Sequence, residues 1–306
     1  MYGVKDVIDF YCGLGEQQWN HHPVAPGRLA CVAPVYGRTL ATKAVNRVVV
    51  PADTWVIQDS GAFSDGPGQR LSVEAALERQ LEHAEQFGYA ARVTHRASYD
   101  WLIDEKWEGG KRSKARWTEQ DAEEAVGVTI AAAVYLASHR HGGHVILSAQ
   151  GVSARQYLYC VQQIVPLLEE GDIFALGGWC VVGKYPAQLM PVFRETMRQV
   201  IPFLGREGVK RVHIWGVCYA RALGELLWLC DEQGIRLSTD SVSPSVRTAL
   251  GEWGYAEWRN PSYQRPPVDV LGLERARHVE MTRTWLHGFR QTCHYRPIPP
   301  RQLSLF

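Results

Sequence analysis

The sequence predicts an α/β fold of the (β/α)8 TIM-barrel class. Short apolar or β-branched runs recur along the chain, and they are separated by segments with helical periodicity, as in repeated βα units with a parallel sheet. Polar residues recur at the ends of these runs, where the reactive groups of such a barrel gather. The length of 306 residues is sufficient for one large domain with a deep core. A doubly wound open sheet is the alternative, since the two folds differ in the number and closure of their strands.

The individual elements follow from the same periodicity. Strands are predicted at residues 7–12, 29–34, 55–59, 92–99, 145–149, 173–177, 211–216 and 236–239. Helices are predicted at Ser72–Phe87, Thr118–Ser138, Ala154–Glu169, Leu189–Leu204 and Ala220–Gln233. Thr118, followed three residues later by Asp121, is typical of a capping box. Eight strands with intervening helices over about 240 residues match the size of a (β/α)8 barrel.

The last part of the chain differs in composition. We expect the barrel to fill residues 1–250, and residues 251–306 to form a short C-terminal extension with one helix at Leu273–Arg290. Residues 241–306 hold nine arginines and no lysine against five acidic residues. A second basic run, KRSKAR at 111–116, holds four cations in six positions. Both regions are either solvated surface or contacts to phosphates.

Composition and charge restrict the classes of function only weakly. The formal net charge of +1 neither demands nor excludes a nucleic-acid partner. The seven cysteines are scattered and form no C-x-x-C pair, which indicates reduced thiols. No apolar run approaches the ~18 residues of a membrane span, and the N-terminus lacks the pattern of a signal peptide. We therefore expect a cytoplasmic protein without a membrane partner.

Polar residues at the predicted strand ends are the candidates for chemistry. Asp59, Asp100 and Asp240 each end a strand, Gln150–Gly151 follows the fifth strand and Gly177–Gly178 the sixth. Taken singly, each aspartate could be a helix cap and each glycine a tight turn. Together they offer carboxylates for N–H donors, and an amide and backbone N–H groups for carbonyl oxygens. The edge of a guanine-like base presents that mixture.

Read in order, these segments resemble the tRNA-guanine transglycosylase superfamily, and they are most similar to its DNA 7-deazaguanine transglycosylase branch. The resemblance covers about residues 10–245. It rests on IQDSGAFSD (57–65), SAQG (148–151), FALGGWCVVG (174–183), VHIWGVC (212–218) and STDSVSPS (238–245), with FYCGLGEQQW (10–19) and YDWLIDE (99–105) similar to further blocks of the DNA-acting branch.

The resemblance implies roles for individual residues. Asp240 would be the nucleophile and Asp59 the general acid/base of a base exchange that needs no cofactor. The pocket for the base would be lined by Ser60, Gly61, Phe63, Asp100, Gln150, Gly151, Gly177 and Gly178. The chemistry is reasonable, because a glycosidic bond breaks through an oxocarbenium-like state that a carboxylate can stabilise and then trap.

Two departures from the family pattern bear on the substrate. Ala62 replaces the second glycine of the DSGGF motif. The C-x-C-x-x-C…H zinc motif of the tRNA enzymes has no counterpart after Asp240, so we expect no metal. The cysteine and histidines that remain there have the wrong spacing for zinc: Cys293, His278, His287 and His294. The loss of this subdomain favours DNA over tRNA.

The expected partners are DNA and a free 7-deazaguanine base such as 7-cyano-7-deazaguanine. The target guanine must leave the stack before Asp240 can reach its sugar, so proteins that open the duplex are further expected partners. Predicted contacts to phosphates are Lys111, Arg112, Arg275, Arg277, Arg283 and Arg290.

Three alternatives remain open at this point. The first is base exchange on tRNA by the same chemistry. The second is a TIM-barrel glycoside hydrolase, since two strand-end carboxylates also suit sugar hydrolysis. The third is a non-enzymatic nucleic-acid-binding barrel, which predicts that Asp59→Asn and Asp240→Asn leave function intact.

Overall fold

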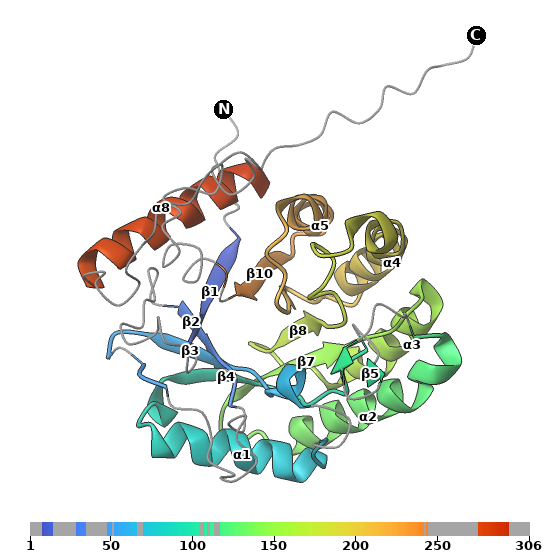
Figure 1. Cartoon of the computed structure of the whole chain (residues 1–306). Coiled ribbons are helices and arrows are strands. Elements are labelled where there is room, and N and C mark those ends of the chain that lie inside the picture. Colours follow the sequence, from blue (N-terminus) through green and yellow to red (C-terminus); the bar gives the residue numbers. More distant parts are fainter. Residues whose placement is uncertain are drawn as a thin grey trace.

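The chain folds as a closed barrel of eight parallel strands with helices around its outside, as the sequence predicts (Figure 1). The structure is a computed structural model that describes residues 8–14, 29–34, 48–50, 52–65, 70–103, 107–108, 111–112, 117–241, 243 and 275–293, with the backbone alone at 64, 107–108, 111–112 and 275–283. The barrel strands are β1 (Asp9–Leu14), β2 (Leu29–Val32), β3 (Trp55–Gln58), β4 (Val93–Ala97), β7 (His144–Ala149), β8 (Ile173–Leu176), β9 (Arg211–Ile214) and β10 (Arg236–Ser241). The open doubly wound sheet is thereby excluded.

The order of the strands fixes which side chains meet at the mouth of the barrel. Around the ring the strands run β1-β10-β9-β8-β7-β4-β3-β2. Strand β1 closes the ring, because Tyr11 pairs with Asp240 of β10 and Gly13 pairs with Cys31 of β2. Strand β4 stands across the ring from β10, since three strands separate the two on either side. All eight strands are parallel, so their carboxyl ends share one rim.

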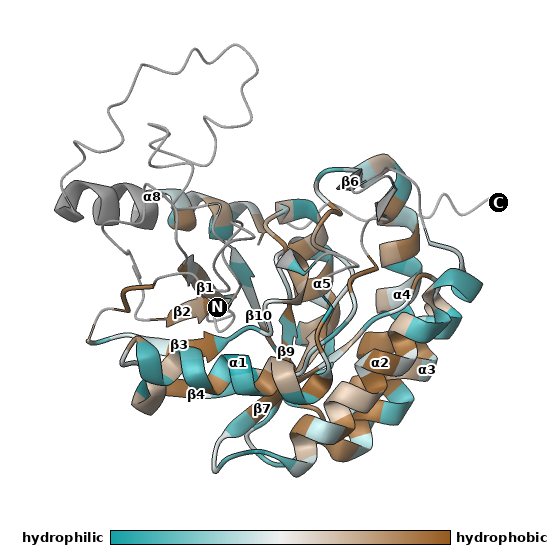
Figure 2. Cartoon of the chain, turned by 60° about the horizontal axis from the view of Figure 1, so that its bottom comes forward, coloured by the Kyte–Doolittle hydropathy of each residue, from teal (hydrophilic) through white to brown (hydrophobic). Residues whose placement is uncertain are grey.

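Six helices of the described chain cover the barrel. They are α1 (Val73–Gln86), α2 (Glu119–Ser138), α3 (Ala154–Ile164), α4 (Pro186–Arg206), α5 (Ala220–Glu232) and α8 (Arg275–Cys293). Ser72, Thr118 and Ser153 cap the first three, each accepting a hydrogen bond from a backbone N–H of the first turn. Thr118 and Asp121 form the predicted capping box. In Figure 2 strand β3 shows hydrophobic residues, whereas α1 carries much hydrophilic surface.

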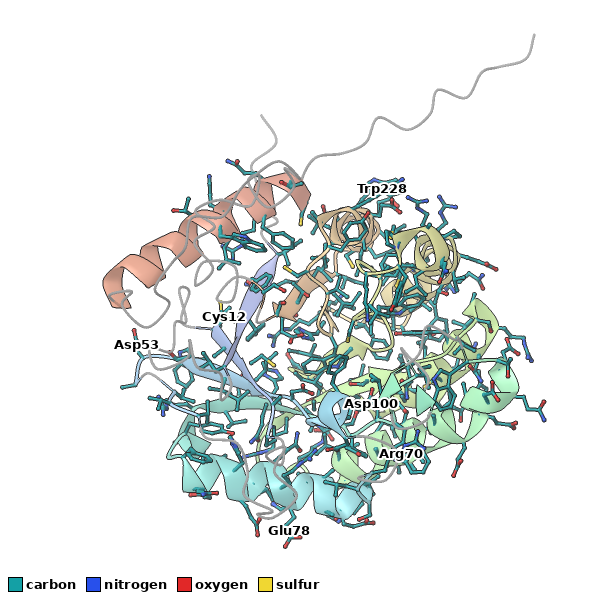
Figure 3. All side chains as sticks on the ribbon, in the orientation of Figure 1. Cys12, Asp53, Arg70, Glu78, Asp100 and Trp228 are labelled. Atoms are coloured by element: carbon teal, nitrogen blue, oxygen red, sulfur yellow. The ribbon has the colours of Figure 1, made fainter. Side chains whose placement is uncertain are left out.

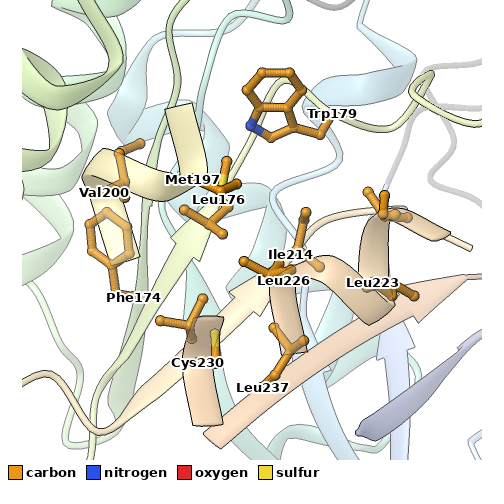
Figure 4. Close-up of a cluster of buried hydrophobic side chains, with 14 of the residues drawn as sticks. Phe174, Leu176, Trp179, Met197, Val200, Ile214, Leu223, Leu226, Cys230 and Leu237 are labelled. Atoms are coloured by element: carbon orange, nitrogen blue, oxygen red, sulfur yellow. The ribbon is translucent and has the colours of Figure 1, made fainter. Parts of the chain in front are cut away.

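Two apolar clusters hold the barrel and its helices together. Figure 4 shows part of the larger cluster, in which Phe174, Leu176, Ile214 and Leu237 of the strands meet Met197, Val200, Leu223, Leu226 and Cys230 of α4 and α5. The smaller cluster fills the barrel interior with Tyr11, Cys31, Ile57, Ala97, Ile146, Ile173, Ala175 and Trp215. The interior below the mouth is therefore a packed core rather than a channel.

Helix α8 follows β10 and packs beside α5, at the place of the last helix of a (β/α)8 barrel (Figure 1). Trp285, Phe289 and Cys293 are buried in the larger apolar cluster. The ring of Phe289 meets that of Phe10 in β1 edge to face, with centroids 5.7 Å apart. The helix of the expected extension thus shares the core of the barrel, and a domain boundary at residue 250 stays a prediction.

Prolines account for two helix ends that differ from the prediction. Helix α3 ends at Ile164 rather than Glu169, and a 3₁₀ turn at Val165–Leu167 follows it. Pro166 lies in this turn and lacks the N–H that an α-helix needs. Helix α4 begins at Pro186 rather than Leu189, because a proline fits the first turn, where no N–H is required. Within the described part of the chain, no helix is both long and apolar enough to cross a membrane.

Candidate active site

A cavity of about 350 Å³ opens at the carboxyl ends of the barrel strands. Every strand, or the loop directly after it, contributes to its lining. The lining includes eight of the predicted site residues: Asp59, Ser60, Gly61, Phe63, Asp100, Gly177, Gly178 and Asp240. Figure 3 shows the labelled Asp100 inside the ring of helices. The volume falls in the range of small-molecule sites, about 300–1,000 Å³.

A larger groove of about 1070 Å³ lies outside the barrel between α2, α3 and α4. Its lining, which includes Glu119, Arg155, Tyr159 and Glu195, contains none of the strand-end residues. Size alone therefore favours the groove, but the convergence of carboxylates and loop backbone favours the cavity at the mouth as the site of chemistry.

Asp59 stands directly after β3 and is held there by its backbone. Its N–H donates to the carbonyl of Val32 at 2.8 Å, and its carbonyl accepts from Nε2 of Gln80 at 3.1 Å. The same nitrogen of Gln80 donates to the carbonyl of Ala97 at 3.0 Å. Because Gln80 is buried on α1, the helix ties the ends of β3 and β4 together beneath the carboxyl group.

Burial and the negative charge of Asp240 raise the pKa of Asp59 to about 6. Hydrogen bonds from the backbone N–H groups of Gly61 and Ser60, and the positive charge of Arg79, act against this rise. A carboxyl group whose pKa lies near neutrality can both give and take a proton at pH 7. The environment of Asp59 is therefore that of a general acid/base.

The turn after Asp59 is rigidly supported. The side chain of Arg79 is completely buried, pairs with Asp65 at 3.0 Å and donates to the carbonyl of Ser60 at 2.5 Å. Gly61 has a φ of +79°, and a Cβ there would overlap the carbonyl oxygen of Pro34. Only glycine both adopts this positive φ without strain and lacks the Cβ that would overlap Pro34. The geometry of this turn therefore explains why the DSGAF segment carries glycine at this position.

Asp240 is oriented by two groups from the neighbouring strand β9 and the loop after it. Its Oδ1 accepts a hydrogen bond from the N–H of Gly216 at 2.7 Å and lies 3.2 Å from Nε2 of His213. His213 is fully buried, and its Nδ1 lies 2.9 Å from the hydroxyl of Ser238. The imidazole is thus held from both sides, and it fixes the direction in which the Asp240 carboxylate faces the cavity.

Cys31 of β2 lines the cavity together with the two aspartates. Burial raises the pKa of its thiol well above the ordinary value, and the negative charges of Asp240 and Asp59 raise it further. A thiol that stays protonated is a hydrogen-bond donor rather than a nucleophile.

The remaining walls suit a flat ligand. Phe63 is 40% exposed at the rim, and Trp215 lies deeper with its Nε1 donating to Ser148 at 2.9 Å. The loop after β8 passes close to Asp100, since a Cβ on Gly177 would lie 3.5 Å from Oδ2 of that residue. Aromatic rings, a carboxylate and glycine backbone therefore surround one space.

Gln150 and Gly151 do not line the cavity. Gln150 is completely buried, and its Nε2 donates to the carbonyl of Trp101 at 2.7 Å and to the hydroxyl of Thr129 at 2.6 Å. Gly151 packs against the backbone of Tyr157. A Cβ added at Gly151 would lie only 2.6 Å from the backbone nitrogen of Tyr157. Both residues support the mouth from behind.

The basic residues predicted to contact phosphates are described only in part. Lys111 and Arg112 form β6 (Lys111–Arg112), which pairs with β5 (Trp107–Glu108) in a hairpin that the sequence did not predict. This hairpin joins β4 to α2, on the mouth side of the barrel. Arg275, Arg277 and Arg283 belong to α8, and their side chains, like those of the hairpin, lie outside the described residues. Arg290 is half-buried, and its Nε is shielded from solvent.

Sequence reasoning missed several residues of the cavity and its support. Cys31, Ser98, Ser148 and Trp215 line the cavity, and His213 supports Asp240 from below. One signal was present for His213, because it is a polar residue inside the otherwise apolar run VHIW. The others became recognisable only when the register of the strands was known.

Within the described residues, no group of three or more His, Cys, Asp or Glu side chains could hold a metal ion. Comparison with protein-family models found no matching family, and comparison with curated proteins found no match.

Proposed function

We propose that the protein exchanges guanine in DNA for a 7-deazaguanine base through a covalent intermediate on Asp240. One observation carries the proposal. Asp59, with a pKa raised to about 6, shares a single cavity with Asp240, whose carboxylate is fixed by Gly216 and His213. A proton carrier and an oriented nucleophile are the two groups that such an exchange requires.

The two carboxyl groups divide the work in two displacements. In the first, an oxygen of Asp240 bonds to C1′ of the nucleotide while the bond from C1′ to the guanine breaks, and protonated Asp59 gives its proton to the departing base. In the second, the ring nitrogen of the incoming base bonds to C1′, its proton passes to Asp59, and the ester bond to Asp240 breaks. Two inversions retain the configuration of the sugar.

The dimensions of the cavity support a single extruded base as the substrate. A cavity of about 350 Å³ among strand ends leaves no room for a stacked duplex, so the target base must be unpaired or turned out of the helix. Phe63 and Trp215 supply aromatic rings to the lining, on which such a base can stack. The choice of DNA over tRNA rests on the resemblance and on the absence from the sequence of the zinc motif after Asp240.

The test is to incubate the full chain with guanine-containing DNA or tRNA and labelled 7-cyano-7-deazaguanine, and to measure which polymer becomes labelled. Label in DNA is expected, with no label from Asp59→Asn or Asp240→Asn. Glu78→Gln is the matched control, because Glu78 is exposed on α1 and points away from the barrel (Figure 3).

The other outcomes separate the alternatives. Label in tRNA alone would identify tRNA, rather than DNA, as the substrate. Cleavage of a glycosidic bond without incorporation would favour a hydrolase. Binding of nucleic acid that survives both aspartate substitutions, without label in either polymer, would contradict the proposal.

A further inference from the structure

Two buried serine hydroxyl groups line the wall of the cavity opposite Asp240, and each can donate a hydrogen bond into the cavity. Ser98, directly after β4, and Ser148, in β7, are each 2% exposed and both line the cavity. The hydroxyl oxygen of Ser98 accepts from the N–H of Ser148 at 3.0 Å, and that of Ser148 accepts from Nε1 of Trp215 at 2.9 Å. Within the described residues, neither hydroxyl donates to a protein group.

The absence of an acceptor matters because both groups are shielded from solvent. A buried hydroxyl donor without a partner destabilises the protein, so such groups are normally satisfied by protein, water or ligand. The open side of both hydroxyls is the cavity itself. An acceptor atom on the ligand would complete the pair.

The topology places this pair opposite the sugar. Strand β4 stands across the ring from β10, which carries Asp240, and β7 is the next strand along. A base whose sugar is held at Asp240 therefore extends its far edge toward Ser98 and Ser148. Asp100, two residues after Ser98, lines the same wall, and its carboxylate can accept hydrogen bonds from N–H groups.

We propose that Ser98 and Ser148 form a donor subsite that binds a carbonyl oxygen on the far edge of the base, beside an N–H group that binds to Asp100. An N–H next to a carbonyl is the pattern of a guanine-type edge, whereas an adenine-type edge presents an amine donor where the serines also donate. This inference rests on the proposed function and names how its site selects the base.

Gln150 does not compete for this role. Both hydrogens of its amide nitrogen are committed, one to the carbonyl of Trp101 and one to Thr129. Thr129 in turn donates to the carbonyl of Ala125 at 2.8 Å, so the amide cannot be reversed without losing the bond to Thr129. The hydroxyls of the two serines are the side-chain donors left on this wall among the described residues.

The experiment is calorimetric titration of the full chain with two free bases, 7-deazaguanine and its analogue that lacks the 6-carbonyl oxygen, 2-amino-7-deazapurine. Wild type is expected to bind 7-deazaguanine at least about 10-fold more tightly than it binds the analogue. Ser98→Ala is expected to weaken the binding of 7-deazaguanine about 3- to 10-fold and to change the binding of the analogue less than about 2-fold.

Two further variants make the result specific. Ser98→Thr retains a hydroxyl and should restore most of the preference, whereas Ser148→Ala should act like Ser98→Ala. Because Ser148 also anchors Trp215, Ser98→Ala is the decisive variant if Ser148→Ala fails to fold. Ser138→Ala removes the same atom from an exposed serine of α2 and should leave both affinities unchanged.

Equal binding of the two bases by wild type, or an unchanged preference in Ser98→Ala, would overturn the subsite and leave the proposed function standing. Failure of the wild-type protein to bind either base would overturn the proposed function and the subsite together.

Discussion

Replacing Asp59 by asparagine should make the folded protein more stable at neutral pH while abolishing base exchange. Burial and the charge of Asp240 raise the pKa of Asp59 from 3.8 to about 6, so ionising this carboxyl group is harder in the folded protein than in the unfolded chain. Each pKa unit corresponds to about 1.4 kcal/mol, and the full shift to about 3 kcal/mol.

The direction of the pH dependence follows from the raised pKa. In wild type, the contribution of Asp59 to stability is fully present below pH 3.8 and is lost as the pH rises through about 6. At about pH 4.5 only about 1 kcal/mol of the loss has occurred, and at about pH 8 all of it has. Asparagine does not ionise, so the stability gained by Asp59→Asn should grow by about 2 kcal/mol between these two pH values.

Thermal unfolding of both proteins at about pH 4.5 and about pH 8 measures this growth. For a chain of 306 residues, 1 kcal/mol corresponds to roughly 2 °C in Tm, so the difference in Tm should increase by about 4 °C. Glu78→Gln, on the exposed side of α1, should show no such increase. An equal difference in Tm at both pH values would refute the raised pKa and with it the assignment of Asp59 as the proton carrier.

The remaining predictions concern the supports of the two aspartates. His213→Gln should slow formation of the covalent intermediate about 10- to 100-fold with base affinity unchanged, because the Asp240 carboxylate loses its orientation. Rapid-quench kinetics measures this rate. In the control His95→Gln, a change at a second buried histidine of the barrel, the rate should stay within about 2-fold of wild type. A rate unaltered by His213→Gln would mean that Gly216 alone suffices to orient Asp240. Gly61→Ala should destabilise the fold by about 2–4 kcal/mol, because a Cβ there overlaps Pro34 and φ is +79°. Gly127→Ala, in the open on α2, should instead stabilise it by about 0.5–1 kcal/mol in the same denaturation assay, and equal effects of the two changes would contradict the strained turn.

The strands and the strand-end carboxylates could be predicted because both depend on local pattern. Apolar runs of strand length gave the eight strands, and a parallel closed ring necessarily brings Asp59 and Asp240 to one rim. Helix ends were less predictable where proline intervened, as Pro166 in the turn after α3 shows.

The orientation of side chains within the site could not be predicted, because it depends on partners far away in the sequence. Gln150 turns from the cavity since Thr129 of α2 and the backbone of Trp101 hold its amide. Ser98 and Ser148 meet because β4 and β7 are neighbours in the ring, although 50 positions separate them in the chain. Neither arrangement has a signature in a single sequence.

The most direct test of the central claim is to trap the intermediate and locate its bond. Full-length protein is incubated with guanine-containing DNA in the absence of a free base, denatured, and separated by electrophoresis, and the adduct is digested and mapped by peptide mass. The account predicts a covalent DNA adduct on the peptide that contains Asp240, its absence in Asp240→Asn, and its disappearance on addition of 7-deazaguanine. An adduct at any other residue, or base exchange that proceeds in Asp240→Asn, would contradict it.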